Sequence, residues 1–356
     1  MNKEKQKEAV KQNMFATMIF WCLFSLVGIV GMVLAASRKT IVIADASPDV
    51  STVSVAEELA VESGSPFDLQ AKGMERVINI PLEKGTKAES VVIENHYMKR
   101  ELWIHILDAT IGFYQENGGY GNLSYVSDAS CDQHDDGVFI KFDMSRVLEY
   151  RTTLEDDVLR IAYYEPHELY DLVVVIDPAA GGMDSGLSEG RTAEKDIVLQ
   201  VAKNIQNAVT QENIKLYFTR LDDIGVDDEE RIWLSEEVKA DAFIRLCVAA
   251  KQDDPEAYGI LGRYNATFFI PGMGNAQLAD IVTRNVTISS SNKAVGLEEA
   301  TRDSILQGIS VPATEVSLGY VTNEQESSLL RQDMYVEKLA EGLAKAILVV
   351  YTNEHE

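Results

Sequence analysis

Residues 173–186, with the sequence VVVIDPAAGGMDSG, set the strictest condition on the fold of this chain. The consecutive apolar residues predict a strand that is buried on both faces, as the strands of parallel sheets are. The glycines at 181, 182 and 186 permit a backbone that other residues cannot follow. Because open α/β sheets bind ligands in loops at the carboxyl ends of their strands, the segment predicts a binding site at this turn. The centre of the turn, however, is two alanines and has no reactive side chain.

Strand and helix patterns alternate from Leu172 onward, which predicts a mixed sheet flanked by helices over residues 169–356. In the helix expected from about Ala193, apolar residues recur every four positions from Ile197 to Val209. Other helices are expected over 229–240, after Gly274, and at the end of the chain. The expected strands are 172–177, 214–219, 242–248, 266–270 and 313–321. These elements form a complete α/β domain.

Residues 76–168 have strand patterns only, several with period-2 alternation and all separated by clusters of Gly, Asp or Asn. The strand segments are RVINIPL, SVVIENHY, ELWIHILDA, NLSYVS, GVFIKFDM and VLRIAYYE. This succession predicts a small all-β sandwich domain that precedes the α/β domain.

The N-terminal region contains a membrane-spanning pattern. Residues 14–37 have no charged side chain and reach the length of roughly 20 residues that a helix needs to cross a bilayer. A cleaved signal peptide is the competing interpretation, but its apolar region is only about 7 to 15 residues long. Lysines before the span favour a cytoplasmic tail over residues 1–13, which places the later domains outside the cytoplasm. Residues 38–75 are acidic and have few aromatic side chains, so we expect a linker there.

The composition excludes one class of partner. The net charge of -25 is far from neutral, whereas binding to nucleic acid requires clustered Lys and Arg. The three cysteines give no disulfide framework: Cys22 lies in the predicted span, and Cys131 and Cys247 could be bridged only if the two domains touch. We expect the last two to be free thiols.

Four segments of the α/β domain follow a motif pattern in order. IDPAAGGMDSG is similar to I-D-P-G-H-G-G-x-D-x-G, and EKDIVLQVAKNIQ is similar to E-K-D-x-N-L-x-x-A. The stretch from FTRLDD to ERIWLSEEVKADAFIRLCVAA is similar to T-R-x-x-D, E-R-x-x-x-A-N and A-D-x-F-I-S-I-H-A-N. VPATEVSLGYVTNEQESSLL is similar to P-A-V-L-V-E-L-G-F-x-S-N-x-x-E. Over residues 172–351 the chain therefore resembles the zinc-dependent N-acetylmuramoyl-L-alanine amidases of bacterial cell walls (amidase type 3 family).

The resemblance implies a zinc ion held by His, Glu and His, with a water in the open position and a further Glu as general base and acid. Such a site lowers the pKa of the bound water to about 7. In this sequence the first His position is Ala180, the Glu position is Glu194, the second His position is Cys247 and the catalytic Glu position is Ser317. Only one of the four chemical positions is retained.

Substitute groups do not complete the predicted site. Cys247 and Glu194 could bind zinc, but Ala180 has no donor atom, so we expect no bound zinc and no other cofactor. Glu315 is a possible surrogate base, displaced by about 6.6 Å along the strand from Ser317. This displacement is too large without a shifted site, because a general base must come within about 3 Å of its proton. We expect the binding cleft to include Asp177, Asp184, Glu194, Arg220, Arg231, Cys247 and Ser317.

The β unit resembles the AMIN domains that often precede such amidases and that bind the wall or the division machinery, and its segment 137–165 has that pattern. The leading hypothesis is a membrane-anchored, catalytically degenerate amidase that binds peptidoglycan or a cell-wall or division protein. One alternative is an active amidase with a rearranged zinc site formed by Glu194, Cys247 and a third ligand. Another is a structural tether.

Overall fold

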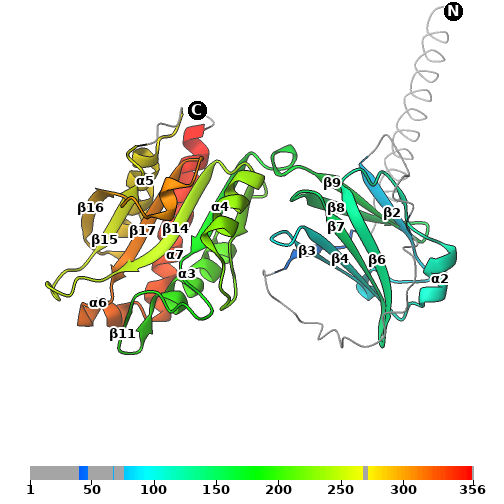
Figure 1. Ribbon diagram of the computed structural model, residues 1–356, viewed down its shortest axis with the longest axis horizontal. Helices are drawn as coiled ribbons and strands as arrows, with labels where there is room; N and C mark the ends of the chain where they lie inside the picture. The colour runs from blue at the N-terminus through cyan, green and yellow to red at the C-terminus, as the bar shows by residue number, and fades with distance from the viewer. Residues whose placement is uncertain (1–39, 47–66, 68–75, 268–271, 355–356) are drawn as a thin grey trace, which may run out of the picture.

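The computed structural model describes residues 40–46, 67, 76–267 and 272–354. Two units lie side by side, a β-sheet unit and an α/β domain (Figure 1). The predicted cytoplasmic tail and membrane-spanning helix, residues 1–37, fall outside the described residues. Among the helices that are described, none is both long and apolar enough to cross a membrane.

The β-sheet unit has two sheets that share one hydrophobic core, so the prediction of a β-sheet region before the α/β domain is confirmed. One sheet has the order β1-β3-β4-β7-β6 and the other β5-β2-β9-β8. In β4 every second side chain, at Leu102, Ile104 and Ile106, is completely buried. The strands are β1 (Ile43–Asp45), β2 (Val77–Pro81), β3 (Val91–His96), β4 (Glu101–Leu107), β5 (Tyr120–Gly121), β6 (Val126–His134), β7 (Gly137–Met144), β8 (Glu149–Glu155) and β9 (Val158–Tyr164). A short helix, α2 (Ile111–Glu116), and two 3-10 turns complete the unit.

Two features of this unit differ from the prediction. The segment predicted as a strand at 122–127 is mainly a turn that leads into β6. Most of β6 and all of β8 were not predicted as strands, because both are rich in polar residues and have no alternating apolar pattern. The segment predicted as a linker also contributes to the unit. Its strand β1 pairs in parallel with β3, and its Phe67 is 5% exposed and packs edge-on against Phe142.

The α/β domain has a six-stranded sheet in the order β13-β10-β14-β17-β15-β16. The sheet is mixed, as predicted, because β15 runs antiparallel to β17 while the other neighbours are parallel. The strands are β10 (Leu172–Pro178), β13 (Ile214–Phe218), β14 (Ala242–Ala249), β15 (Ile260–Tyr264), β16 (Ala294–Glu299) and β17 (Ala313–Tyr320). The helices are α3 (Glu194–Ala208), α4 (Asp228–Glu237), α5 (Asn275–Ser290), α6 (Glu324–Leu329) and α7 (Asp333–Glu354), and a two-stranded ribbon joins β11 (Ser188–Glu189) to β12 (Thr192–Ala193).

The two faces of this sheet have different covers. Apolar residues of α3, α5 and α7 form the larger core with alternate residues of the strands, such as Ile244 and Leu246. On the opposite face Val173, Val175 and Phe243 pack against α4 and against Tyr97 of the β-sheet unit. Figure 1 shows α4 on the side of the sheet nearer to that unit.

Of the strand predicted at 266–270, residues 268–270 lie outside the described part of the chain, and residues 266 and 267 form a bend. The strand that the structure describes in this region is β15, Ile260–Tyr264, which was not predicted. The strand ends because the Asn265 side chain accepts a hydrogen bond from the Thr267 N–H at 2.9 Å, a local turn that competes with strand pairing. The exposed strand β16 and the short helix α6 were not predicted either.

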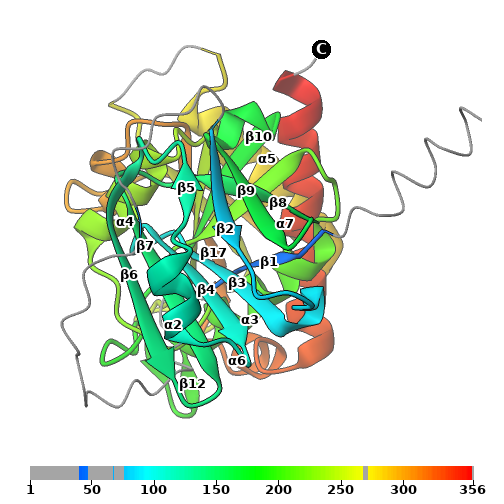
Figure 2. The ribbon, with the colours of Figure 1, turned by 90° about the vertical axis from the view of Figure 1, so that its right-hand side faces the viewer.

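The two units touch along the edge strand β13. Lys215 lies between Asp45 and Glu149 of the β-sheet unit, with its Nζ 2.6 Å and 2.9 Å from their carboxylate oxygens. The Tyr97 hydroxyl donates to the Phe218 carbonyl at 2.8 Å and accepts from the Phe218 N–H at 3.1 Å. The two Tyr97 bonds satisfy the backbone N–H and carbonyl of Phe218 at the outer edge of β13. The view in Figure 2 has the β-sheet unit in front of the α/β domain.

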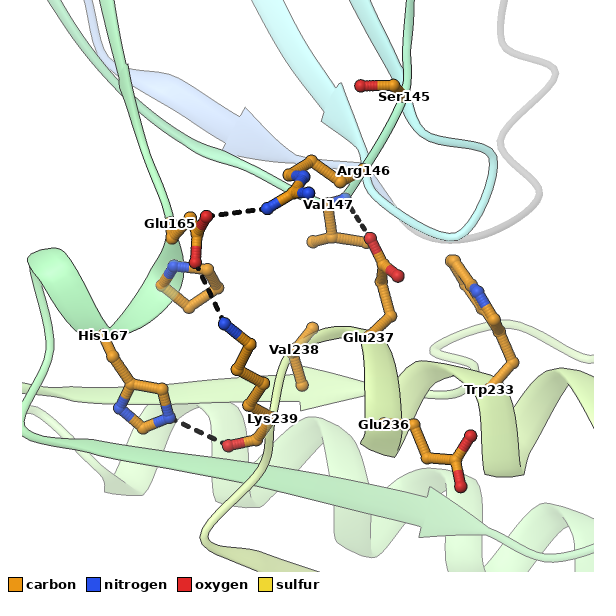
Figure 3. A pocket seen from close by; sticks show the side chains of 11 residues that line it. Ser145, Arg146, Val147, Glu165, His167, Trp233, Glu236, Glu237, Val238 and Lys239 are labelled. Carbon is orange, nitrogen blue, oxygen red and sulfur yellow. Dashed lines mark hydrogen bonds and ion pairs between the residues drawn. The ribbon is translucent and has the colours of Figure 1, made fainter. Parts of the chain in front are cut away.

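A separate crevice of about 340 Å³ lies between the units at the C-terminal end of α4 (Figure 3). Glu165 links its two sides, since it accepts from Arg146 at 2.7 Å and from Lys239 at 3.2 Å. The backbone N–H of Val147 donates to Glu237 at 3.1 Å. Ion pairs and a backbone hydrogen bond thus join the two units at this crevice.

Candidate functional site

The glycine-rich turn after β10 has a backbone that few residues can adopt. Ala180 has φ 56°, Gly181 126° and Gly182 60°, all in the left-handed region. A Cβ atom on Gly181 would lie 2.1 Å from the Ile224 carbonyl oxygen, so the close approach of these segments excludes a side chain. Gly181 and Asp184 exchange backbone hydrogen bonds of 2.9 and 3.1 Å across the turn. The turn is therefore a fixed part of the structure.

Two buried arginines hold the carbonyl groups at the start of the turn. Arg220 is completely buried and donates to the carbonyl oxygens of Pro178 and Ala179 at 3.0 and 2.7 Å. Arg231 donates to the carbonyl oxygens of Pro178 and Ala180 at 3.0 and 3.1 Å. Burial, together with the nearby Arg231, lowers the pKa of Arg220 to about 10. Both arginines, which the sequence placed in the binding cleft, support the backbone of the turn.

Charged side chains cross the sheet beside this turn in one row of neighbouring strand positions. Asp177 is the strand partner of Arg245, Arg245 of Glu315, Glu315 of Arg263 and Arg263 of Glu298. We call these five residues the charge row. Their signs alternate, which is the favourable arrangement for cross-strand pairs. The row spans β10, β14, β17, β15 and β16.

Ion pairs connect the members of the charge row. Arg263 Nη1 lies 2.7 Å from Glu315 Oε1, and Arg263 Nε lies 3.5 Å from Glu298 Oε2. Arg245 forms an ion pair with Asp177 and has its Nε 3.9 Å from Glu315 Oε2. Asp177 is fully buried and also pairs with Arg231. Burial would raise the pKa of Asp177, but the two guanidinium groups outweigh burial and lower it.

Two of the four positions at which the resemblance implies zinc chemistry, Cys247 and Ser317, lie next to the charge row. Cys247 and Ser317 are strand partners, two residues beyond Arg245 and Glu315 and hence on the same face of the sheet. Ser317 is fully buried, and its Oγ accepts from Arg263 Nη1 at 3.3 Å. A guanidinium group thus contacts the side chain at the position where the resemblance implies the catalytic Glu.

The carboxylate of Glu194 is used by the backbone around it. Its Oε2 accepts from the Leu187 N–H and its Oε1 from the Val248 N–H, both at 2.9 Å. Gly186 lies so close that a Cβ atom there would be 2.2 Å from Glu194 Oε2. Burial raises the pKa of Glu194, although the two backbone hydrogen bonds oppose this change.

The sequence-predicted cleft is only partly assembled. Asp177, Arg231 and the turn meet directly, and Glu194 lies beside Cys247 through its bond to Val248. Asp184 lies apart, at the exposed end of the turn, where it accepts from the Gly186 N–H at 2.9 Å. Glu315, the possible surrogate base, is engaged by Arg263.

Sequence reasoning missed Arg245, Arg263 and Glu298. A usable signal was present for the first, because an arginine in the middle of the apolar strand AFIRLCV requires a partner when it is buried. No such signal existed for the other two, because neither the strand ILGRY, Ile260–Tyr264, nor β16 was predicted.

Comparisons with known proteins identify the family of the α/β domain. Residues 174–349 match the family model described as N-acetylmuramoyl-L-alanine amidase, Amidase_3. The α/β domain therefore belongs to this family of cell-wall amidases, and the resemblance inferred from the four motif segments is confirmed at the level of the family.

Curated relatives have moderate identity. The endolysin of Bacillus phage SPP1 is 28% identical over 184 residues, which cover 49% of this chain and 64% of that protein. The probable cell wall amidase LytH of Staphylococcus aureus is 26% identical over 195 residues, covering 53% and 61%. This chain thus spans less than two thirds of the length of either relative. A crystal structure of an N-acetylmuramoyl-L-alanine amidase from Clostridium difficile 630 is 26% identical with a TM-score of 0.47, over 50% of this chain and 95% of the other.

The side chains present do not fit the zinc ion that the family implies. Ala180 has no donor atom, and both oxygens of Glu194 already accept backbone hydrogen bonds. Burial, reinforced by the carboxylates of Glu315 and Glu194, raises the pKa of the Cys247 thiol, which disfavours the thiolate that a metal requires. Within the described ranges, no group of three or more His, Cys, Asp or Glu side chains is arranged to hold a metal ion.

Cys131 and Cys247 are both free and buried, in the β-sheet unit and in the α/β domain respectively. Burial raises the pKa of the Cys131 thiol to about 12. Cys131 therefore belongs to the hydrophobic core of the β-sheet unit, whereas Cys247 is buried beside the charge row.

Proposed function

We propose that this protein is a non-catalytic amidase homologue of the bacterial cell envelope that binds peptidoglycan or a protein of the wall or division machinery. The proposal depends on the side chains that this chain has at the four positions where the family has its zinc ligands and its catalytic Glu. Three of them lack the expected donor, and the Arg263 guanidinium lies against Ser317, where the family has its catalytic Glu. A cationic group beside this position opposes the binding of a second cation.

The support for an envelope function comes from the family and from two relatives. The family model is that of a cell-wall amidase, and the relatives are an endolysin and a probable cell wall amidase. A pseudoenzyme that keeps the fold keeps the shape and surface of the cleft without the bond-breaking step. Such a domain can still recognise the polymer or regulate a partner that acts on it.

The remaining parts of the proposal follow from the sequence. Residues 14–37 anchor the protein in the cell membrane by a single helix, with both folded units outside the cytoplasm. The β-sheet unit acts as an AMIN-like positioning domain. Its ion pairs with the α/β domain, Glu149 with Lys215 and Glu165 with Lys239, support a role in which the two units act as one body.

The test is the zinc content and the wall-hydrolysing activity of the full-length chain, purified in detergent, exposed to zinc and passed through a gel-filtration column. We expect less than about one tenth of an equivalent of zinc and no release of peptides from purified peptidoglycan. Near-stoichiometric zinc that is lost in Glu194→Ala or Cys247→Ala would overturn the proposal in favour of an active amidase with a rearranged site. Cys131→Ala is the matched control, because it removes an equally buried thiol from the other unit. Co-sedimentation with intact peptidoglycan distinguishes the two proposed ligands, because the chain pellets with the polymer only if it binds peptidoglycan itself.

A further inference from the structure

The charge row ends in a cavity of about 420 Å³ on the open part of the sheet face. This volume is in the range of about 300 to 1,000 Å³ that is typical of small-molecule sites. Four members of the row, Arg245, Arg263, Glu298 and Glu315, line the cavity. The rest of the lining is Asp228 at the start of α4 together with Glu299, Thr301, Asp303, Ser304 and Ile305. The lining is therefore mostly charged.

The two arginines keep hydrogen-bond donors that no carboxylate uses. Arg245 donates to Asp177 through Nη1, and Arg263 donates to Glu315 and Ser317 through Nη1. Within the part of the chain that the structure describes, the Nη2 group of each has no hydrogen-bond partner. The side chains are 17% and 28% exposed, so they are held in place but reachable. A guanidinium fixed in this way is suited to a planar carboxylate.

Acidic side chains face the same space and exclude a simple anion as the ligand. The cavity is lined by five carboxylates, of Asp228, Glu298, Glu299, Asp303 and Glu315, against the two guanidinium groups. An anion without a positive group would be repelled by this excess of negative charge, and a simple cation would meet the two arginines. Only a ligand that has both a negative and a positive group can pair with the arginines and with the carboxylates of this cavity.

We propose that this cavity binds a peptide end that combines a carboxylate with a side-chain ammonium group. Arg245 and Arg263 receive the carboxylate through their free N–H groups, and Glu298 with its acidic neighbours receives the ammonium group. The proposal rests on the proposed function, because it assigns a ligand class to the cleft of a non-catalytic domain. It needs no metal ion, since the charges that recognise the ligand are all side chains of this chain.

Isothermal titration calorimetry of the full-length chain with three peptides tests the proposal. The probe is acetyl-Ala-Lys with a free carboxyl terminus. Acetyl-Ala-Lys amide lacks the carboxylate, and acetyl-Ala-norleucine lacks the ammonium group but keeps the carboxylate. We expect each control peptide to bind about tenfold more weakly or worse, which is the factor for one lost hydrogen bond to a charged group. Equal binding of the three peptides, or no binding of any, would overturn the proposal.

Two variants test which side chain binds each charged group of the peptide. Arg263→Gln should bind the probe about as weakly as the wild type binds the amide peptide. Glu298→Gln should bind the probe about as weakly as the wild type binds the norleucine peptide. Glu298 is 57% exposed, so its variant tests the proposal even if Arg263→Gln does not fold. Arg284→Gln on α5 and Glu341→Gln on α7 are matched controls, because they remove the same charges from exposed pairs outside the cavity. Unchanged affinity in both cavity variants would reject the assignment.

The two proposals fail in different ways. Zinc binding with wall hydrolysis would end the proposed function, whatever the peptides do. Absence of peptide binding in a chain that takes up no zinc and hydrolyses nothing would end the inference on the cavity alone.

Discussion

Asp177 shows at the level of one residue how the site is stabilised. Its carboxylate lies between two guanidinium groups, those of Arg231 and Arg245, with no exposure to solvent. Replacing it by Asn leaves both arginines without a counter-ion, and we expect Asp177→Asn to lower the free energy of unfolding by about 3–5 kcal/mol at pH 7. Urea denaturation of the two proteins measures the difference.

The same residue predicts a pH dependence. Because the folded state lowers the pKa of Asp177, its stabilising contribution is complete above the unfolded-state pKa of about 4 and is lost as the pH falls through the lower folded-state value. The difference between wild type and Asp177→Asn should therefore shrink below about pH 4. Asp280→Asn, in an exposed pair on α5, is the control and should change stability by less than about 1 kcal/mol. A constant difference down to pH 2 would contradict the argument.

At the scale of the element, the turn and α3 depend on a glycine that touches Glu194. Gly186 and Gly190 have nearly equal φ values, 63° and 59°, but only at Gly186 would a Cβ atom meet neighbouring atoms. Gly190→Ala should cost about 1–2 kcal/mol for the left-handed backbone alone. Gly186→Ala should cost about 1–3 kcal/mol more, because the methyl group displaces the Glu194 carboxylate from its backbone donors. Equal midpoints of urea unfolding for the two variants would show that this contact is unimportant.

Helices and strands were predictable where burial imposes a regular pattern of apolar residues, and they were missed where it does not. The strand 172–178 is buried along its whole length, and the apolar face of α3 repeats every four residues, so both follow from the sequence. Strand β16 has no fully buried residue, and its position at the sheet edge depends on β15. The charge row could not be predicted for the same reason, since it requires the register of five strands at once.

At the scale of the whole molecule, Lys215 joins the two units. The side chain comes from the edge strand of the α/β domain, is 11% exposed, and lies within 3 Å of carboxylates from two strands of the β-sheet unit. Tyr217 adds a hydrogen bond of 2.6 Å to Glu149. Burial raises the pKa of Glu149, and Lys215 is the main group that opposes this change, so the charged form of this carboxylate relies on Lys215. We therefore expect the junction to weaken when the cation is removed.

Lys215→Met keeps most of the side-chain volume but leaves Glu149 and Asp45 without their cation. We expect the junction to lose about 3–5 kcal/mol, since an unpaired buried charge is more costly than the original pair is stabilising. In differential scanning calorimetry of the full-length chain, the wild type should then unfold with the two units together, and the variant in two separate transitions. Lys345→Met removes an exposed i,i+4 pair of α7 and should leave the trace unchanged. A single unshifted transition in Lys215→Met would mean that the units are joined mainly by the Tyr97 contact with β13 and by the ion pairs around Glu165.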